Sequence, residues 1–245
     1  FAFISALSAE HLMTFALLFI VGLVGAFLFV RFNRKESLID LGILQNHRFV
    51  ALIFSLLVYQ ALLLGLSFVL PSFIQVSAGF SSSVAGLFMF PGALIGAVLA
   101  PISGKVLDQI GARKPITTGL ILAALGLALL FVFLPTKSLA LLLVAHIVLM
   151  LGLGISYSNL MTCSLSTLAT DQLSDGNALV NTLQQFIGAV ATAVVATTLS
   201  IFQGLNGFKV GTSHGTSIIL ALFFILIIVS LIVSFPNLKK IRANH

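Results

Sequence analysis

The sequence predicts an all-α membrane protein that crosses a lipid bilayer about seven times. Three observations predict this fold class: 59% of the 245 residues are hydrophobic, only 7% are charged, and the mean hydropathy is +1.20. A soluble domain carries about 25% charged residues, because its surface faces water. Here 12 Lys or Arg and 6 Asp or Glu residues are too few to cover a soluble globule of this size. The surface of the fold must therefore face lipid.

Seven apolar runs are long enough to cross the bilayer as helices. The hydrocarbon core is about 30 Å thick, so a spanning helix needs about 20 residues. A helix also satisfies its own backbone N–H and C=O groups, which find no partner in hydrocarbon. The runs are approximately residues 12–30, 49–70, 84–103, 116–135, 139–161, 179–202 and 216–235. A β-barrel would need alternating segments of about 10 residues, and stretches such as ALLLVAHIVLMLGLG do not alternate.

The first run, residues 12–30, follows the start FAFISALSAEHL, which has no Met and no basic segment ahead of its apolar stretch. This start is typical neither of a complete chain nor of a signal peptide, so we expect the run to continue a longer protein. Residues 31–48 come next and contain SLIDLGIL, which is too short to span. We expect either a short interfacial helix on the cytoplasmic face or an irregular connector.

Basic residues predict the orientation of the spans. If residues 31–48 face the cytoplasm, the same side receives 104–115, 162–178 and 237–245, and carries ten of the twelve Lys and Arg residues. The remaining two are Lys137 and Lys209. Positive charge favours the cytoplasmic side, so the C-terminus is predicted to be cytoplasmic. A nucleic-acid partner is not expected, because such a surface would gather its basic residues in one patch.

The third span, 84–103, contains Gly92 and Gly96, a GxxxG pair that allows close helix packing. Pro91 interrupts a backbone hydrogen bond and predicts a kink. Close packing and a rocking hinge both remain possible roles for this segment.

The loop after this span reads GKVLDQIGARK, residues 104–114. Gly104 allows helix ends to approach closely, and Gly111 permits a tight turn with positive φ. Asp108 can accept hydrogen bonds from a helix N-terminus or from Arg113. A cytoplasmic gating loop of this kind would hold two helices together in one state and release them in another. Its residues are Gly104, Asp108, Gly111, Arg113 and Lys114. An ordinary turn with positive-inside charges fits the same residues.

His146 lies well inside the fifth span, in the stretch LLLVAHIVLML. Imidazole changes its charge near neutral pH, so His146 is a candidate proton relay. A neutral histidine that forms a hydrogen bond with a neighbouring helix is the more common case.

Polar residues also share one face of the sixth span, because Asn181, Gln184, Gln185, Gly188 and Thr192 recur at helical spacing. Unsatisfied amides in lipid cost several kcal/mol, so this face is expected to meet protein or a water-filled cavity. The candidate substrate cavity comprises Tyr59, Gln60, Asn159, Asn181, Gln184 and Gln185. Ordinary interhelical hydrogen bonds, worth about 0.6 kcal/mol per pair, explain the same pattern.

The loop at residues 104–114 resembles the G-x-x-x-D-x-x-G-x-R-K signature of the major facilitator superfamily. Two further stretches resemble its fourteen-helix drug:proton antiporter branch. LIDL with NHRF, within residues 38–49, is similar to the segment that leads into helix 9, and NTLQQFIG, residues 181–188, is similar to helix 13. The resemblance covers nearly the whole chain. It implies that residues 12–30 are helix 8 and that residues 49–235 are helices 9–14.

The fold implied is the second six-helix bundle of a major facilitator, plus one preceding helix. Residues 1–48 would end the central extra helix pair and add a cytoplasmic connector, and residues 49–245 would form the bundle and a cytoplasmic tail. The resemblance implies a bacterial cytoplasmic-membrane transporter, not an enzyme, that exports lipophilic or amphipathic compounds in exchange for protons by alternating access. Its partners would be substrate, protons, lipid and the N-terminal half of the same transporter. No cofactor or metal is expected.

The six Asp and Glu residues lie in loops or at span ends. A proton-carrying carboxylate is therefore expected in the N-terminal half.

Several alternatives remain. A major facilitator with another cargo, such as a sugar, peptide or siderophore, is the main one. A small intramembrane protease would need Gly-x-Ser-Gly, and Pro101 stands at the first Gly position before Ser103 and Gly104. Metal catalysis is poorly supported, because the sequence contains neither an HExxH motif nor paired carboxylates. A seven-helix retinal protein would need a lysine in its last span, and this sequence has none there. No feature of the sequence favours a receptor.

Overall fold

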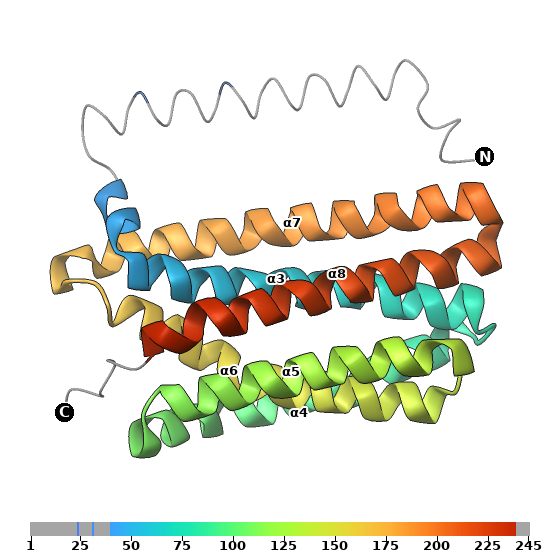
Figure 1. Ribbon diagram of the computed structural model, residues 1–245, viewed down its shortest axis with the longest axis horizontal. Helices are drawn as coiled ribbons and strands as arrows, with labels where there is room; N and C mark the ends of the chain where they lie inside the picture. Colours follow the sequence, from blue (N-terminus) through green and yellow to red (C-terminus); the bar gives the residue numbers. More distant parts are fainter. Residues whose placement is uncertain (1–23, 25–30, 32–39, 239–245) are drawn as a thin grey trace. The chain divides into compact units, whose positions relative to one another are not determined.

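The computed structural model describes residues 24, 31 and 40–238 of the chain (Figure 1). Two compact units are distinguished, Phe1–Gly42 and Ile43–His245. In the first unit, the Asp40 carboxylate accepts a hydrogen bond from the backbone N–H of Gly42, at 2.8 Å. Apart from Val24, the predicted span at 12–30 lies outside the described residues.

The second unit is a bundle of long helices in its described part (Figure 1). They are α3 (His47–Ser72), α4 (Ser82–Ile110), α5 (Arg113–Phe133), α6 (Leu139–Leu165), α7 (Leu173–Asn206) and α8 (Phe208–Asn237). Short helical turns precede or extend them: η1 (Leu41–Gln45), η2 (Phe73–Ser77), η3 (Leu134–Thr136) and η4 (Thr170–Gln172). All six long helices have the length and apolar character needed to cross a membrane, which confirms the predicted fold class.

Helix α4 corrects the predicted extent of the gating loop. It continues through both of its prolines to Ile110, so Gly104 and Asp108 lie in its last turns and not in a loop. Only Gly111 and Ala112 separate α4 from α5. The apolar run ends at residue 103, but the helix continues to Ile110. An amphiphilic last turn at the membrane surface can stay helical without being hydrophobic.

The two glycines of this region differ in role. Gly111 has φ 76°, as predicted for the tight turn, and its N–H donates to the Leu107 carbonyl at 2.9 Å. The close helix approach expected at Gly104 is not found among the described residues, where no atom of another element lies within 4 Å of the place its Cβ would take.

Asn46 begins α3 and also connects it to α6. Its side-chain oxygen accepts hydrogen bonds from the backbone N–H groups of Arg48, at 3.1 Å, and Phe49, at 3.3 Å. This is the N-cap arrangement, which satisfies amides that the first helical turn leaves unpaired. The amide nitrogen of Asn46 donates to the carbonyl of Thr167, just after α6, at 2.9 Å. The connector therefore ends in η1 and a capped helix start.

The six helices pack as two groups of three (Figure 1). One group contains α4, α5 and α6, and the other contains α3, α7 and α8, while α3 with α6 and α5 with α8 join them. Backbones approach closely between α5 and α6. A Cβ on Gly119 would lie 2.6 Å from the Gly152 carbonyl oxygen, and one on Gly126 would lie 2.5 Å from the Leu149 nitrogen. Small residues permit such contact between spanning helices.

The predicted GxxxG pair of α4 packs through only one of its members. A Cβ on Gly92 would collide with the His146 ring and would lie 2.8 Å from Met150 Cγ, whereas nothing lies within 4 Å of a Cβ on Gly96. The close contact is therefore with α6, at Gly92 alone.

Helices α4 and α7 are the least covered. In an apolar 18-residue stretch of each helix, 17% of α4 and 22% of α7 is buried, against 33–67% for the other four spans. Leu87 and Phe90 of α4 are 71% and 62% exposed, and Phe186 of α7 is 63% exposed. These two helices therefore present large apolar faces away from the bundle.

Candidate functional site

A polar chain of three side chains crosses α3, α6 and α7. The amide nitrogen of Gln184 donates to the Tyr157 hydroxyl, and that hydroxyl donates to the side-chain oxygen of Gln60, both at 2.7 Å. The three groups are partly buried. The sequence pattern points to the two glutamines but not to Tyr157. The available signal was that Tyr157 lies two residues before Asn159 on the same span.

Gly188 brings α3 and α7 together beside this chain, one helical turn after Gln184. A Cβ at Gly188 would collide with a methyl group of Leu64 and would lie 3.6 Å from the amide nitrogen of Gln60. A larger residue here would separate the two helices that carry the glutamines. The glycine on the predicted polar face of α7 therefore positions the site.

Tyr59 and Asn159 do not join this network. Tyr59 is fully buried, and its hydroxyl lies 2.8 Å from the Ser156 hydroxyl, which also donates to the Gly152 carbonyl at 2.7 Å. Asn159 is 1% exposed and donates to the Ile155 carbonyl of its own helix at 2.8 Å. Both residues satisfy their polar groups inside the packed bundle.

Asn181 and Gln185 lie on the exposed side of α7. The amide nitrogen of Asn181 donates to the backbone and side-chain oxygens of Asn177, at 2.9 and 3.1 Å. The predicted polar face of α7 therefore divides: Gln184 turns toward α6, whereas Asn181 and Gln185 present amides away from the described bundle.

His146 is fully buried between α6 and α4. Its ring stacks on Phe88 with the ring centroids 5.3 Å apart and the planes at 29°. Neither ring nitrogen has a hydrogen-bond partner among the residues that the structure describes. The interhelical hydrogen bond considered from the sequence is thus not found in this part of the chain.

At the α4–α5 turn, the predicted pairing of Asp108 with Arg113 is not formed. Arg113 places its guanidinium carbon 4.5 Å from the centroid of the Phe235 ring, which joins the start of α5 to the end of α8. Asp108 and Lys114 are exposed. Within residues 40–238, the Asp108 side chain makes no hydrogen bond or ion pair, so its carboxylate is available to a partner outside this region.

Candidate metal ligands do not cluster in the described residues, where no group of three His, Cys, Asp or Glu side chains could hold an ion. The buried polar side chains of the described spans are hydroxyls, the Asn159 amide and the His146 imidazole.

Comparison with known proteins places these features in a family. The family model described as "Major Facilitator Superfamily" matches residues 2–193. Lincomycin resistance protein LmrB of Listeria innocua is 29% identical over 180 residues, which are 74% of this chain and 38% of that protein. The Multidrug resistance protein B homolog of Mycobacterium tuberculosis is 30% identical over 185 residues, 74% of this chain and 34% of the relative.

A third relative is Multidrug efflux pump LfrA of Mycolicibacterium smegmatis, 24% identical over 190 residues, which are 77% of this chain and 38% of the pump. The matched part of the chain thus spans well under half the length of these relatives. The family match covers most of the chain, and the structure supplies the apolar spanning helices that such a fold needs. The chain is an integral membrane protein and belongs to the Major Facilitator Superfamily.

Proposed function

We propose that this chain is the second bundle of a transporter that exports lipophilic or amphipathic compounds in exchange for protons. The observation that carries this proposal is the Gln184–Tyr157–Gln60 chain, which gathers neutral donors and acceptors from three helices. Sites for small organic molecules combine apolar walls with a few placed polar groups. The relatives named for lincomycin resistance, multidrug resistance and multidrug efflux support the same class of cargo.

Asn181 and Gln185, on the exposed side of α7, add two further amides next to the Gln184–Tyr157–Gln60 chain. In alternating access, two bundles rock around a site near the membrane midplane. The amides on α7 would then face the N-terminal half of the transporter across a shared cavity. Substrate and proton would bias the equilibrium only through their different affinities for the two states.

The turn between α4 and α5 is proposed as a cytoplasmic gate. Asp108 stands exposed at the end of α4, and Gly111 fixes the turn that follows it. In one state the carboxylate would accept hydrogen bonds from a basic side chain or helix N-terminus of the other bundle. The excess of basic residues on this side supports a cytoplasmic location for the turn and the C-terminus, in a bacterial cytoplasmic membrane.

His146 is proposed as a secondary proton relay, since its buried ring has both nitrogens free of partners in the described bundle. The described acidic residues lie at helix ends, so the main proton-binding carboxylate is assigned to the N-terminal half.

The two tyrosines of the chain offer a matched test of the proposed site. In the transporter that contains this chain, Tyr157→Phe removes the hydroxyl shared by two glutamines, and Tyr59→Phe removes one inside the packed core. A hydrogen bond contributes about 0.5–1.5 kcal/mol, so we expect Tyr157→Phe to shift the apparent affinity for a transported compound by about 2- to 10-fold. Tyr59→Phe should leave that affinity unchanged.

The measurement is efflux of lincomycin and of a lipophilic dye from cells that lack other exporters, at equal transporter levels. Absence of any efflux by the unsubstituted transporter would reject export of these compounds. Equal effects of the two substitutions on affinity would reject the proposed site.

A further inference from the structure

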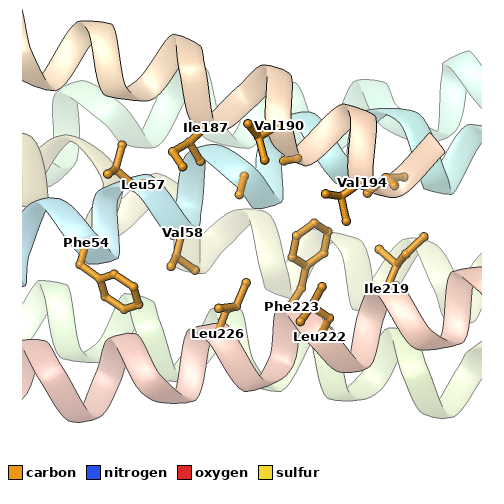
Figure 2. Close-up of a pocket in the computed structure, with 13 residues that line it drawn as sticks. Phe54, Leu57, Val58, Ile187, Val190, Val194, Ile219, Leu222, Phe223 and Leu226 are labelled. Carbon is orange, nitrogen blue, oxygen red and sulfur yellow. The ribbon is translucent and has the colours of Figure 1, made fainter. Parts of the chain in front are cut away.

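A cavity of about 290 Å³ lies between α3, α7 and α8 (Figure 2). Each helix contributes one face to it, from within residues 54–61, 187–195 and 219–226. Along α3 and α8 the lining positions recur at helical spacing, so these side chains point to one side of each helix. All lining residues are apolar. The cavity therefore offers neither a hydrogen bond nor a charge to its contents.

Polar contacts hold these helices together on both sides of the cavity. The hydroxyls of Ser55 and Ser234 lie 2.6 Å apart between α3 and α8. At the α7–α8 hairpin, the amide nitrogen of Gln203 donates to the Thr212 hydroxyl at 2.8 Å. Figure 1 shows α7 and α8 converging toward this hairpin and separating away from it. The two contacts therefore hold α8 to its neighbours on either side of the cavity.

The cavity has a buried floor and an exposed mouth. The floor is formed by three residues that are 1–3% exposed: Val195, Ile219 and Phe223. The mouth is formed by three residues that are 40–45% exposed: Val190, Val194 and Leu222. The mouth residues come only from α7 and α8, so the cavity opens to the outside between these two helices.

The cavity lies at the depth of the hydrocarbon. Phe54 and Ala61 stand 7 and 14 residues after the start of α3 at His47, which is about 10 and 20 Å along a helix. In a hydrocarbon layer about 30 Å thick, this range surrounds the middle. Ile225, beside the mouth on α8, is 58% exposed. Acyl chains, and not water, are the abundant molecules at this depth.

We propose that the α3–α7–α8 cavity binds the acyl chain of a membrane phospholipid, which enters between α7 and α8. An engineered apolar cavity of about 150 Å³ binds benzene, so the larger volume here holds a segment of acyl chain. The gain comes from dispersion contacts, because an empty void leaves its lining atoms without neighbours. The apolar walls give no selectivity for a headgroup. This inference does not depend on the proposed export.

The test uses the absence of tryptophan from the chain, which makes any introduced tryptophan the sole emitter of its kind. The full chain with Phe223→Trp is reconstituted in phosphatidylcholine vesicles whose acyl chains carry bromine at the middle or near either end. Bromine quenches tryptophan on contact. We expect Phe223→Trp to lose most of its fluorescence. Phe73→Trp is the matched control, because Phe73 is fully buried and does not line the cavity.

A second substitution shows whether the quencher enters through the cavity. Ala191 lines the cavity, whereas Ala193 is exposed on α7 and does not. Added to Phe223→Trp, Ala191→Phe should restore fluorescence to the level of the Phe73→Trp control, and Ala193→Phe should not. Ile219→Trp, also on the floor, repeats the measurement if Phe223→Trp fails to fold. Equal quenching of floor and control positions, or quenching that survives Ala191→Phe, would overturn the proposal.

Discussion

His146 is held in α6 with its ring against Phe88 of α4 and its nitrogens unpaired in the described bundle. Such burial costs free energy, because each ring nitrogen loses the hydrogen bond that water would supply. The contact with Gly92 leaves no room for a larger residue on the facing helix. Because its buried imidazole, unpaired among the described residues, lowers stability, His146 is better explained by a functional role than by a stabilising one.

Replacing His146 by Phe separates these two roles. Because the substitution removes an unsatisfied buried polar group, worth about 1–3 kcal/mol, and keeps an aromatic ring, we expect no loss of stability. The measurement is unfolding of the full chain in mixed micelles titrated with denaturing detergent. A clear loss of stability would indicate that the imidazole has a partner outside the described residues. In the whole transporter, the proposed relay predicts weaker proton-coupled efflux.

Two glycines on neighbouring helices allow a matched stability measurement. Gly119→Ala forces a Cβ against the Gly152 carbonyl, whereas Gly96→Ala adds one where nothing lies within 4 Å. Overpacking costs about 1–3 kcal/mol, so Gly119→Ala should unfold at lower denaturing-detergent concentration. Gly96→Ala should leave the midpoint unchanged or raise it, since alanine favours helix. Equal destabilisation by both would contradict the described α5–α6 contact.

At the scale of elements, the turn from α4 to α5 shows what the sequence predicts and where it fails. The positive φ of Gly111 follows from its residue type. The pairing of Asp108 with Arg113 does not follow, because Arg113 is at the first position of α5 and turns toward Phe235 on α8. Contacts between helices distant in sequence are set by packing, which local spacing does not encode.

Asp108→Asn tests the proposed gate. A hydrogen bond to a charged group contributes about 1.5–3 kcal/mol, and the substitution weakens it while keeping size and shape. In the whole transporter we expect efflux to fall by about tenfold or more, with unchanged amounts of protein in the membrane. Asp171→Asn is the control, because Asp171 is also an exposed carboxylate near a helix end. Undiminished efflux with Asp108→Asn would reject the gate.

For the whole molecule, composition and run length predict the class of fold and the position of each described span, because both depend on summed hydrophobicity. The arrangement of the candidate substrate-cavity residues could not be predicted in the same way. Gln60 and Gln184 meet through Tyr157, whereas Tyr59 and Asn159 point into the core. Side chains one position apart on a helix face directions about 100° apart, and the sequence alone does not say which direction faces a cavity.

The uncovered faces of α4 and α7 predict that the chain does not transport by itself. A site for alternating access needs two bundles, and the described helices form one. We expect proteoliposomes with the purified 245-residue chain to show no proton-driven substrate movement. Proteoliposomes with the whole transporter are the control. Substrate transport by the chain alone, above that of empty vesicles, would contradict the two-bundle proposal.

Two hydrogen bonds between the α3 and α6 segments limit how the two groups of helices can move. Asn46, at the start of α3, donates to the Thr167 carbonyl just after α6, and Gln60, further along α3, accepts from the Tyr157 hydroxyl of α6. Sliding α3 along α6 would break both hydrogen bonds at once, whereas turning all six helices together breaks neither. Rotation of the described helices as one block therefore keeps both hydrogen bonds, whereas sliding of α3 along α6 does not.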